Sequence, residues 1–399
     1  MRGNVWKRAL AALAGCTLLM AAGCGGGDTG SAVSSQGGAS ASTGTSTSTS
    51  AAAPETTTTQ TPASQTESQQ TQAPTTTAAP QPNGERTTDI GIWYSTWYAK
   101  KAENSPDNKI NTWTAWNIPF KPLLPDGRYE TYDSLDEEVT LFHLKMMSEA
   151  QIDFIIMDQT NNIDVDGGYI NQRSLSVAKT IKKYNDDPSH RPVKYCSAIG
   201  GIQWSQDAAT IENEAMLLWN RYCAQDYGGE KYHYMIDGKP VMVVYGDGAK
   251  DKWDAYTGDK TYASKFSIRW ADNASRPGYW GWAFDKGTKE HWETMVVMPG
   301  WNNMKGATPV PRRYGETYKK SWDVVLNAET KPRILVINSF NEYAERTAVF
   351  PADSSTAVPV SDRWLNEEYE VDNTMYWEMT VEYIRQFKAM DKPLTVPYA

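Results

Sequence analysis

Residues 90–98 read Ile90-Gly91-Ile92-Trp93-Tyr94-Ser95-Thr96-Trp97-Tyr98, an apolar run followed at once by hydroxyl and aromatic side chains. The first five residues have the continuous apolar character of a strand that is buried on both faces of a parallel sheet. No glycine-rich dinucleotide fingerprint follows them, although an open Rossmann sheet would carry one at this point. The run therefore favours a barrel of parallel strands over an open nucleotide-binding sheet.

Similar apolar runs recur along the chain and alternate with segments of helical periodicity. The predicted strands are Ile90–Tyr94, Phe154–Met157, Val193–Ala198, Pro240–Tyr245, Phe266–Trp270, Thr294–Met298 and Ile334–Ile337. The predicted helices are Leu135–Ala150, Gln172–Tyr184, Asp207–Gln225, Arg313–Ala328 and Asn373–Met390. Short buried strands that alternate with helices indicate βαβ units. We therefore predict a single (β/α)8 TIM barrel over residues 89–399.

Aromatic residues are distributed unevenly over the 399 residues. All 22 Tyr, all eight Phe and 15 of the 16 Trp follow residue 88, whereas residues 25–88 contain none. The charge balance is acidic, with 39 Lys and Arg against 48 Asp and Glu. A nucleic-acid-binding surface needs a basic stripe, so we expect no nucleic-acid partner.

The N-terminus has the pattern of an export signal. Basic residues precede an apolar stretch from Ala9 to Ala22, which is typical of a signal peptide over residues 1–23. The stretch ends in Ala21-Ala22-Gly23-Cys24, which resembles the lipobox of bacterial lipoproteins. That resemblance implies a lipid anchor on Cys24 and a location in the bacterial cell envelope. The alternative is an ordinary secretory signal with an incidental cysteine.

Residues 24–88 read as a linker. Ser and Thr make up 27 of the 64 residues in 25–88, and the rest are mostly Ala, Pro, Gln and Gly. Such a composition cannot bury enough apolar surface to offset the entropy of ordering, so we predict a disordered tether. We expect a monomer whose only contact with the membrane is the lipid at Cys24.

Polar and aromatic residues cluster where the predicted strands end. In a barrel of this type the carboxyl ends of the strands and the loops after them form the active site. Aromatic rings beside amides and carboxylates suit a sugar, whose apolar ring faces stack while its hydroxyls form hydrogen bonds. An alternative is that these rings merely pack the barrel rim. The candidate substrate-binding residues are Trp97, Tyr98, Trp116, Asp158, Tyr245, Trp301, Asn302 and Asn341.

Glu342 and Glu345 are the candidate catalytic residues. They lie three positions apart, directly after the predicted strand Ile334–Ile337. In a helical turn this spacing places the two Cβ atoms about 5–6 Å apart on one face. Retaining glycosidases use two carboxyl groups at about that separation. The alternative is a solvated helix start, where Glu is favoured by the helix dipole.

Four motifs occur in order over residues 89–352. They are Tyr94-Ser95-Thr96-Trp97-Tyr98, Tyr132-Asp133-Ser134-Leu135-Asp136 with the later His143, Ile236-Asp237-Gly238-Lys239-Pro240-Val241, and Ser339-Phe340-Asn341-Glu342-Tyr343-Ala344-Glu345. Together they resemble glycoside hydrolase family 99, which comprises endo-acting α-mannosidases and α-mannanases on (β/α)8 barrels. The related family 71 and the WbsX-type glycan proteins share parts of this pattern.

The resemblance implies a metal-independent, cofactor-independent retaining hydrolysis of an α-linked polysaccharide or oligosaccharide. By position, Glu342 would be the base that activates the 2-hydroxyl of the sugar itself, giving a 1,2-anhydro intermediate. Glu345 would be the general acid and base for the leaving group and for water. Two alternatives stay open: an α-glucanase of the family 71 type, and a non-catalytic glycan-binding surface lipoprotein.

The sequence departs from the family pattern at several positions. Tyr343 replaces a Trp, Arg346 replaces a Gly, and Ile118 replaces the His of an early Trp-Asn-His-Pro segment. Thr347-Ala348-Val349-Phe350-Pro351 lacks the Gln and Glu of the family motif. We expect these changes near the sugar subsites, where they bear on specificity for mannose more than on the reaction type.

Cys196 and Cys223 are the two cysteines of the predicted barrel. An exported protein could join them in a disulfide. One lies in a predicted strand and the other at the end of a predicted helix, and because the sequence does not show the geometry that a disulfide needs, we predict two separate buried thiols.

Overall fold

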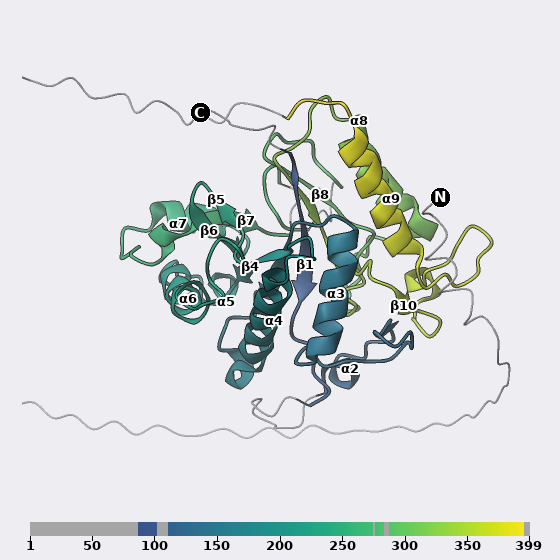
Figure 1. Ribbon diagram of the computed structural model, residues 1–399, viewed down its shortest axis with the longest axis horizontal. Helices are drawn as coiled ribbons and strands as arrows, with labels where there is room; N and C mark the ends of the chain where they lie inside the picture. The colour runs from purple at the N-terminus through teal and green to yellow at the C-terminus, as the bar shows by residue number, and fades with distance from the viewer. Residues whose placement is uncertain (1–86, 102–110, 274–275, 283–286, 395–399) are drawn as a thin grey trace, which may run out of the picture. The chain divides into compact units, whose positions relative to one another are not determined.

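The computed structural model describes residues 87–101, 111–273, 276–282 and 287–394 (Figure 1). The predicted signal peptide 1–23 and nearly all of the linker 24–88, including Cys24, lie outside these residues and stay predictions. Among the described residues, no helix combines the length and the apolar character needed to cross a bilayer.

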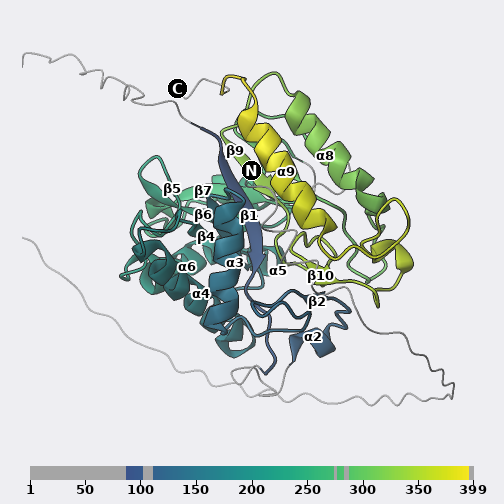
Figure 2. The same cartoon turned by 45° about the vertical axis from the view of Figure 1, so that its right-hand side comes forward.

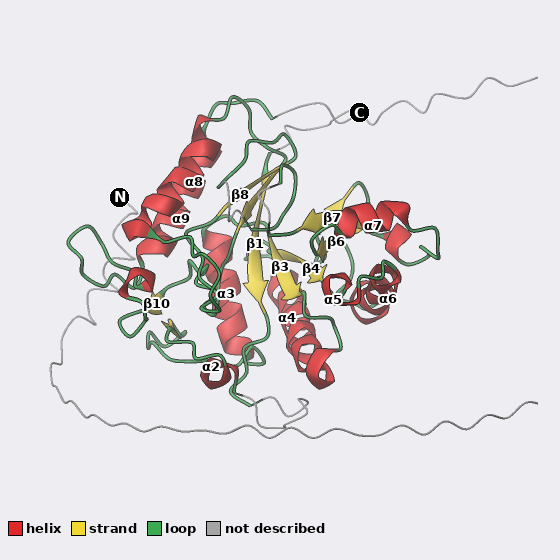
Figure 3. Ribbon diagram, turned by 180° about the vertical axis from the view of Figure 1, so that it is seen from behind, coloured by secondary structure: helices red, strands yellow, loops and turns green. Residues whose placement is uncertain are grey.

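Seven parallel strands form one curled sheet (Figure 3). They are β1 (Asp89–Ser95), β3 (Phe154–Gln159), β4 (Lys194–Ile199), β6 (Lys239–Tyr245), β7 (Ser267–Ala271), β8 (Thr294–Val297) and β9 (Ile334–Ile337). Their order is β7-β6-β4-β3-β1-β9-β8, so consecutive parallel strands are neighbours, as in a barrel. All seven predicted strands are confirmed, and their bounds agree to within two residues.

The sheet has no eighth ladder in the described residues, because β7 and β8 are not paired. An irregular segment lies between these two edges instead. The backbone N–H groups of Trp280 and Trp282 donate to Trp270 O (2.8 Å) and Asp272 O (3.1 Å). The Trp280 indole donates to Thr294 Oγ1 of β8 at 2.9 Å. The prediction of a barrel-like α/β fold is therefore confirmed, whereas closure by an eighth regular strand is not.

The five predicted helices pack outside the sheet. They correspond to α3 (Glu137–Glu149), α4 (Tyr169–Asp186), α6 (Ala209–Leu218), α8 (Glu316–Asn327) and α9 (Met375–Ala389), and α8 and α9 lie side by side (Figures 1 and 2). The Asp136 side chain fixes the start of α3 by accepting from Glu138 N and Val139 N. Shorter elements that the sequence did not predict are α2 (Thr112–Ala115), α5 (Ile202–Ser205), α7 (Ala249–Ala255), β2 (Lys121–Pro122), β5 (Met235–Ile236) and β10 (Ala352–Asp353).

Alternate residues of each strand face opposite sides of the sheet. Trp93 and Phe154 belong to the inner cluster, whereas Tyr94 and Ile155 belong to the cluster under the helices. Cys196 lies in the inner cluster and Cys223 packs against the outer one, and both are free thiols. The prediction of two separate thiols is confirmed, because the two side chains lie on opposite faces of the sheet.

Candidate active site

The loop after β9 is tied to β1 by the side chain of Asn341. Its Oδ1 accepts from the backbone N–H of Ser95 at 2.7 Å. Its Nδ2 donates to Ser95 O at 3.0 Å and to the hydroxyl of Tyr132 at 2.8 Å. Asn341 is fully buried, so these bonds form where water does not compete. They set the position of the loop that carries both candidate carboxylates.

Tyr98 holds the same loop from the other side. Its hydroxyl donates to Asn341 O at 2.7 Å and accepts from the backbone N–H of Tyr343 at 2.9 Å. Both Tyr98 and Asn341 are fully buried and neither lines the cavity described below. The prediction that they touch substrate is corrected: their polar groups are used to position the loop.

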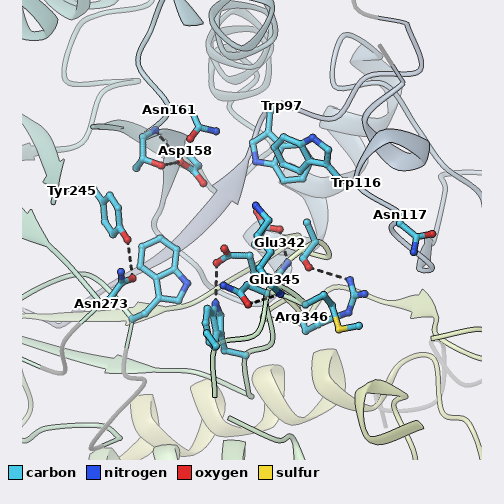
Figure 4. A pocket seen from close by; sticks show the side chains of 18 of the residues that line it. Trp97, Trp116, Asn117, Asp158, Asn161, Tyr245, Asn273, Glu342, Glu345 and Arg346 are labelled. Atoms are coloured by element: carbon cyan, nitrogen blue, oxygen red, sulfur yellow. Dashed lines mark hydrogen bonds between the residues drawn. The ribbon is translucent and has the colours of Figure 1, made fainter. Parts of the chain in front are cut away.

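A cavity of about 1500 Å³ opens at the carboxyl ends of the strands (Figure 4). It exceeds the roughly 300–1,000 Å³ typical of sites for drug-sized ligands. Seven of the ten residues predicted from the sequence to bind substrate or to act in catalysis line it: Trp97, Trp116, Asp158, Tyr245, Trp301, Glu342 and Glu345. The sequence therefore placed most of its candidate site residues around one cavity.

Glu342 lies at the base of the cavity and is 7% exposed. Its Oε2 accepts from Ser95 Oγ at 2.9 Å, and its Oε1 accepts from the backbone N–H of Glu345 at 3.1 Å. Burial raises its pKa to about 8, and the negative charges of Glu345 and Asp158 act in the same direction. Glu342 therefore carries a proton at neutral pH in the free site.

Glu345 is the second carboxyl group of the cavity. Its Oε2 accepts from the indole Nε1 of Trp301 at 2.9 Å. Burial raises its pKa, the Trp301 hydrogen bond opposes this, and Lys305 stabilises the negative charge. Residues 343–346 form a turn rather than a helix. The hydrogen bond from the backbone N–H of Glu345 to the carboxyl group of Glu342 links the two residues. The two carboxyl groups also interact electrostatically, because the charge of Glu345 raises the pKa of Glu342.

Asp158 is a third carboxyl group facing the cavity. It is the penultimate residue of β3, in register with Ser95 of β1, and its Oδ1 accepts from the backbone N–H and the hydroxyl of Thr160. Burial raises its pKa, whereas the two bonds from Thr160 lower it. Figure 4 shows Asp158 across the cavity from Glu342 and Glu345. A sugar hydroxyl bound between them could donate to Asp158.

Aromatic rings form two walls of the cavity. Trp97 and Trp116 lie together with ring centroids 4.3 Å apart, and Trp116 is 42% exposed. Tyr245 packs edge-on against Trp282 at 5.4 Å, and its hydroxyl donates to Asn273 Oδ1 at 2.8 Å. Figure 4 shows the Trp97–Trp116 pair and Tyr245 on different sides of the two carboxylates. Sugar rings on both sides of the pair would therefore meet an apolar surface.

Asn302 does not line the cavity, so its predicted role in substrate binding is corrected. It is largely buried, and its Nδ2 donates to both carboxylate oxygens of Asp362. Its backbone N–H donates to Glu345 O at 2.9 Å. Asn302 thus supports the catalytic turn from below.

Arg346, which stands where family 99 has a glycine, lines the cavity. Its φ is 63°, in the left-handed region that glycine adopts without strain. Its guanidinium donates to Tyr343 O (2.6 Å), Ala344 O (3.1 Å) and Asp362 Oδ2 (3.3 Å). The departure from the family pattern therefore keeps the backbone shape of the turn and adds a side chain that binds it.

Two other departures lie in the core, not at the sugar subsites as expected. Tyr343 is fully buried, packs against Phe120 and donates through its hydroxyl to Phe350 O. Ile118 is 8% exposed and belongs to the outer apolar cluster. The expectation that all the changes bear on specificity is therefore wrong for Tyr343 and Ile118.

Several residues that line the cavity are not among the candidates predicted from the sequence. Asn161, Gln206, Asp247, Asn273, Trp282, Asn303, Met304 and Lys305 all line the cavity, and Ser95 bonds to Glu342. Asn161, Asp247 and Asn273 each follow the end of a strand closely, which is a signal that could have identified them. In the described part of the chain, no group of three or more His, Cys, Asp or Glu is placed to hold a metal ion.

The fold is similar to solved glycosidase structures. A glycoside hydrolase family 99 endo-α-mannosidase from Bacteroides thetaiotaomicron, in complex with BIS-TRIS-propane, is 17% identical, with a TM-score of 0.53 over 76% of this chain and 98% of that chain. A second structure of that endo-α-mannosidase is 16% identical, with a TM-score of 0.51 over the same shares. The sequence matches no protein-family model and no curated protein. On structural similarity, the chain contains a domain with a glycoside hydrolase family 99-like fold.

Proposed function

We propose that the domain is a retaining glycoside hydrolase that cleaves an α-linked polysaccharide or oligosaccharide. One observation carries the proposal: Glu342 and Glu345 face one cavity, linked by a hydrogen bond, between two aromatic walls. The similarity in fold to family 99 endo-α-mannosidases supports α-linked mannose as the first substrate class to test.

The proposed reaction begins with neighbouring-group attack. Glu342 removes the proton of the sugar 2-hydroxyl, and the oxygen forms a bond to the anomeric carbon while the glycosidic C–O bond breaks. Glu345 donates its proton to the leaving oxygen. Glu345 then removes a proton from water, whose oxygen opens the 1,2-anhydro ring at the anomeric carbon. Glu342 returns the proton to the 2-oxygen, so two inversions give net retention.

This cycle needs one proton on the pair. In the free site that proton resides mainly on Glu342, whose pKa is raised to about 8. The reactive form has the proton on Glu345 and the charge on Glu342. A 2-hydroxyl bound against Glu342 favours this form because a hydrogen bond to a carboxylate stabilises its charge. The two groups titrate as a coupled pair, so its pH limits belong to both.

A hydrolysis screen of residues 89–399 tests the proposal. The substrates are α-mannans, α-glucans and host-type glycans, and the controls are Glu342→Gln and Glu345→Gln. We expect oligosaccharide release that both substitutions abolish. Release from α-glucan only would favour the α-glucanase alternative. Binding without release by the wild-type domain would favour the glycan-binding alternative, and near wild-type rates in either variant would contradict the assigned roles.

We also propose that the domain is held in the cell envelope by a lipid on Cys24, with residues 24–88 as the tether. The lipobox-like Ala21-Ala22-Gly23-Cys24 supports this. Cys24→Ala in the full chain should move the protein from the membrane fraction to the soluble fraction. Cys16→Ala is the matched control, because Leu13-Ala14-Gly15-Cys16 has a similar local pattern. Release by the control alone would assign the anchor to Cys16.

A further inference from the structure

We propose a second glycan-binding site, formed by Tyr314 and Tyr369 outside the catalytic cavity. It rests on the proposed function, because its ligand would be a further stretch of the same polysaccharide. The two rings meet edge to face, with centroids 5.0 Å apart and an interplanar angle of 79°. They are 49% and 67% exposed, and neither lines the cavity. Exposed aromatic pairs of this kind need an explanation other than core packing.

The backbone at Tyr369 is strained. Tyr369 lies in a short hairpin closed by the Leu365–Val371 bridge, and its N–H donates to Asn366 O at 3.0 Å. Its φ is 64°, a left-handed conformation that such a hairpin usually gives to glycine or asparagine. For a bulky residue this conformation is an unfavourable outlier. The turn therefore holds an exposed ring at a position where glycine would fit better.

The backbone at Tyr314 has the same feature. Arg313, Tyr314 and Gly315 have φ values of 50°, 55° and 88°, so three successive residues are left-handed. Strained backbone of this kind is concentrated at functional sites, because it persists only where the surroundings enforce it. Both members of the ring pair are thus displayed by unfavourable backbone conformations, although their side chains gain little burial.

The pair lies on the side of the sheet where the cavity opens. Tyr314 directly precedes α8, which follows β8, and Tyr369 lies shortly before α9, which follows β9. The starts of such helices lie at the carboxyl ends of the strands. The loop between β10 and the Tyr369 hairpin also contributes Thr356 and Val358 to the cavity. One polymer chain could therefore reach both sites.

The surroundings specify the chemistry of the ligand. Glu367, Glu368 and Glu370 flank Tyr369 and are exposed, as is Glu316 beside Tyr314. These four carboxylates outnumber the exposed Arg313 that directly precedes Tyr314, and this acidic excess disfavours an anionic polymer. Tyrosine presents an apolar ring face with a polar tip, which suits stacking on a sugar ring and hydrogen bonding to its hydroxyls. A neutral polysaccharide meets both conditions.

The test measures retention of the 89–399 domain in native gels that contain α-mannan or, in parallel, glycogen. All proteins carry Glu345→Gln so that the polymer is not cut. Tyr369→Gly removes one ring and relieves the positive φ, so its melting temperature should not fall. We expect it to weaken binding by about fivefold or more. Trp292→Ala is the matched control. Trp292 is also an exposed aromatic residue (40%), but it lies just before the amino-terminal end of β8, whereas the tyrosine pair lies on the side of the carboxyl ends of the strands.

Equal retention of Tyr369→Gly and its parent on both polymers would overturn the proposal, as would equal loss in Trp292→Ala. So would a change in oligomeric mass by light scattering without a change in retention, because the rings would then bind a second copy of the chain. The outcome is separable from the proposed function. Hydrolysis is measured on the wild-type domain, and retention is measured on the Glu345→Gln proteins. No hydrolysis together with retention that depends on Tyr369 would contradict the hydrolase and support the second site.

Discussion

The indole Nε1 of Trp301 lies 2.9 Å from Oε2 of Glu345 and donates a hydrogen bond to it. Trp301 comes from the loop after β8, and Glu345 from the loop after β9. A hydrogen bond to a carboxylate stabilises its charged form and lowers its pKa. Trp301 therefore does more than supply an apolar wall, because it sets the acidity of one member of the catalytic pair.

Trp301→Phe should raise the pKa of Glu345, because burial then acts without the opposing hydrogen bond. The acid limb of the kcat/KM profile should move to higher pH by roughly one unit, since a hydrogen bond to a charged group contributes about 1.5–3 kcal/mol. Trp116→Phe is the control, because Trp116 lines the cavity without a bond to Glu345. An acid limb that does not move in Trp301→Phe would contradict this role.

The alkaline limb of the same profile reports on loss of the last proton of the coupled pair, to which Glu342 contributes most. Since the pKa of Glu342 is about 8, kcat/KM should fall above about pH 8, where the pair loses its last proton. Ser95→Ala removes a donor to the Glu342 carboxylate and should move this limb to higher pH. Profiles from pH 5 to pH 10 test both statements. An alkaline limb that moves down in Ser95→Ala would show that Ser95 does not stabilise the charged form.

Glu342 should also destabilise the fold as the pH rises. In the unfolded chain its pKa is near 4.5, and in the folded chain it is about 8, so between these values the unfolded state binds fewer protons. Stability is therefore lost as the pH rises from 4.5 to 8. Glu342→Gln removes this pH dependence. The free energy of unfolding of the variant minus that of the wild-type domain should therefore increase by about 3 kcal/mol between pH 5 and pH 8. Denaturant titrations at both pH values measure this, and a constant difference would contradict it.

The strands, and the position of Glu342 and Glu345 at one cavity, could be predicted because their signals are local. Seven apolar runs marked the strands, and Glu342 and Glu345 follow one of them directly. The direction of each neighbouring side chain could not be predicted. Trp97 faces the cavity while the adjacent Tyr98 faces the core, and Asn341 and Glu342 differ in the same way. A strand end alone does not say which of two adjacent polar residues meets the ligand.

The segment between β7 and β8 was less predictable for a different reason. Trp280 bonds to both sheet edges and Trp282 to the residue after β7 without forming a regular strand, so no periodic pattern marks them. Trp282 reaches the cavity from this irregular segment. Arg346 lines the cavity, as expected for a change near the sugar subsites, but its bond to Asp362, 16 positions later, and its left-handed backbone could not be predicted.

Arg346→Gly should destabilise the domain even though it restores the glycine of the family motif. The substitution relieves the positive φ, which is worth about 1 kcal/mol. However, it breaks the buried ion pair of Arg346 with Asp362, at a cost of up to roughly 3–5 kcal/mol. Adding Asp362→Asn should recover much of that loss, because the buried charge is then gone. Free energies of unfolding for both single variants and the double variant complete the cycle, and additive effects would exclude the coupling.

Tyr98→Phe separates a positioning role from substrate binding. The substitution removes the hydroxyl that bonds to Asn341 O and Tyr343 N, and leaves both backbone groups buried without this partner. We expect a loss of about 1–3 kcal/mol in the free energy of unfolding, because buried unsatisfied groups keep their desolvation cost. Since Tyr98 does not line the cavity, KM should stay close to the wild-type value, whereas kcat should fall with the displacement of Glu342 and Glu345. Trp97→Phe, which alters a ring in the cavity wall, should instead raise KM. A rise in KM with unchanged stability in Tyr98→Phe would return Tyr98 to the substrate-binding surface.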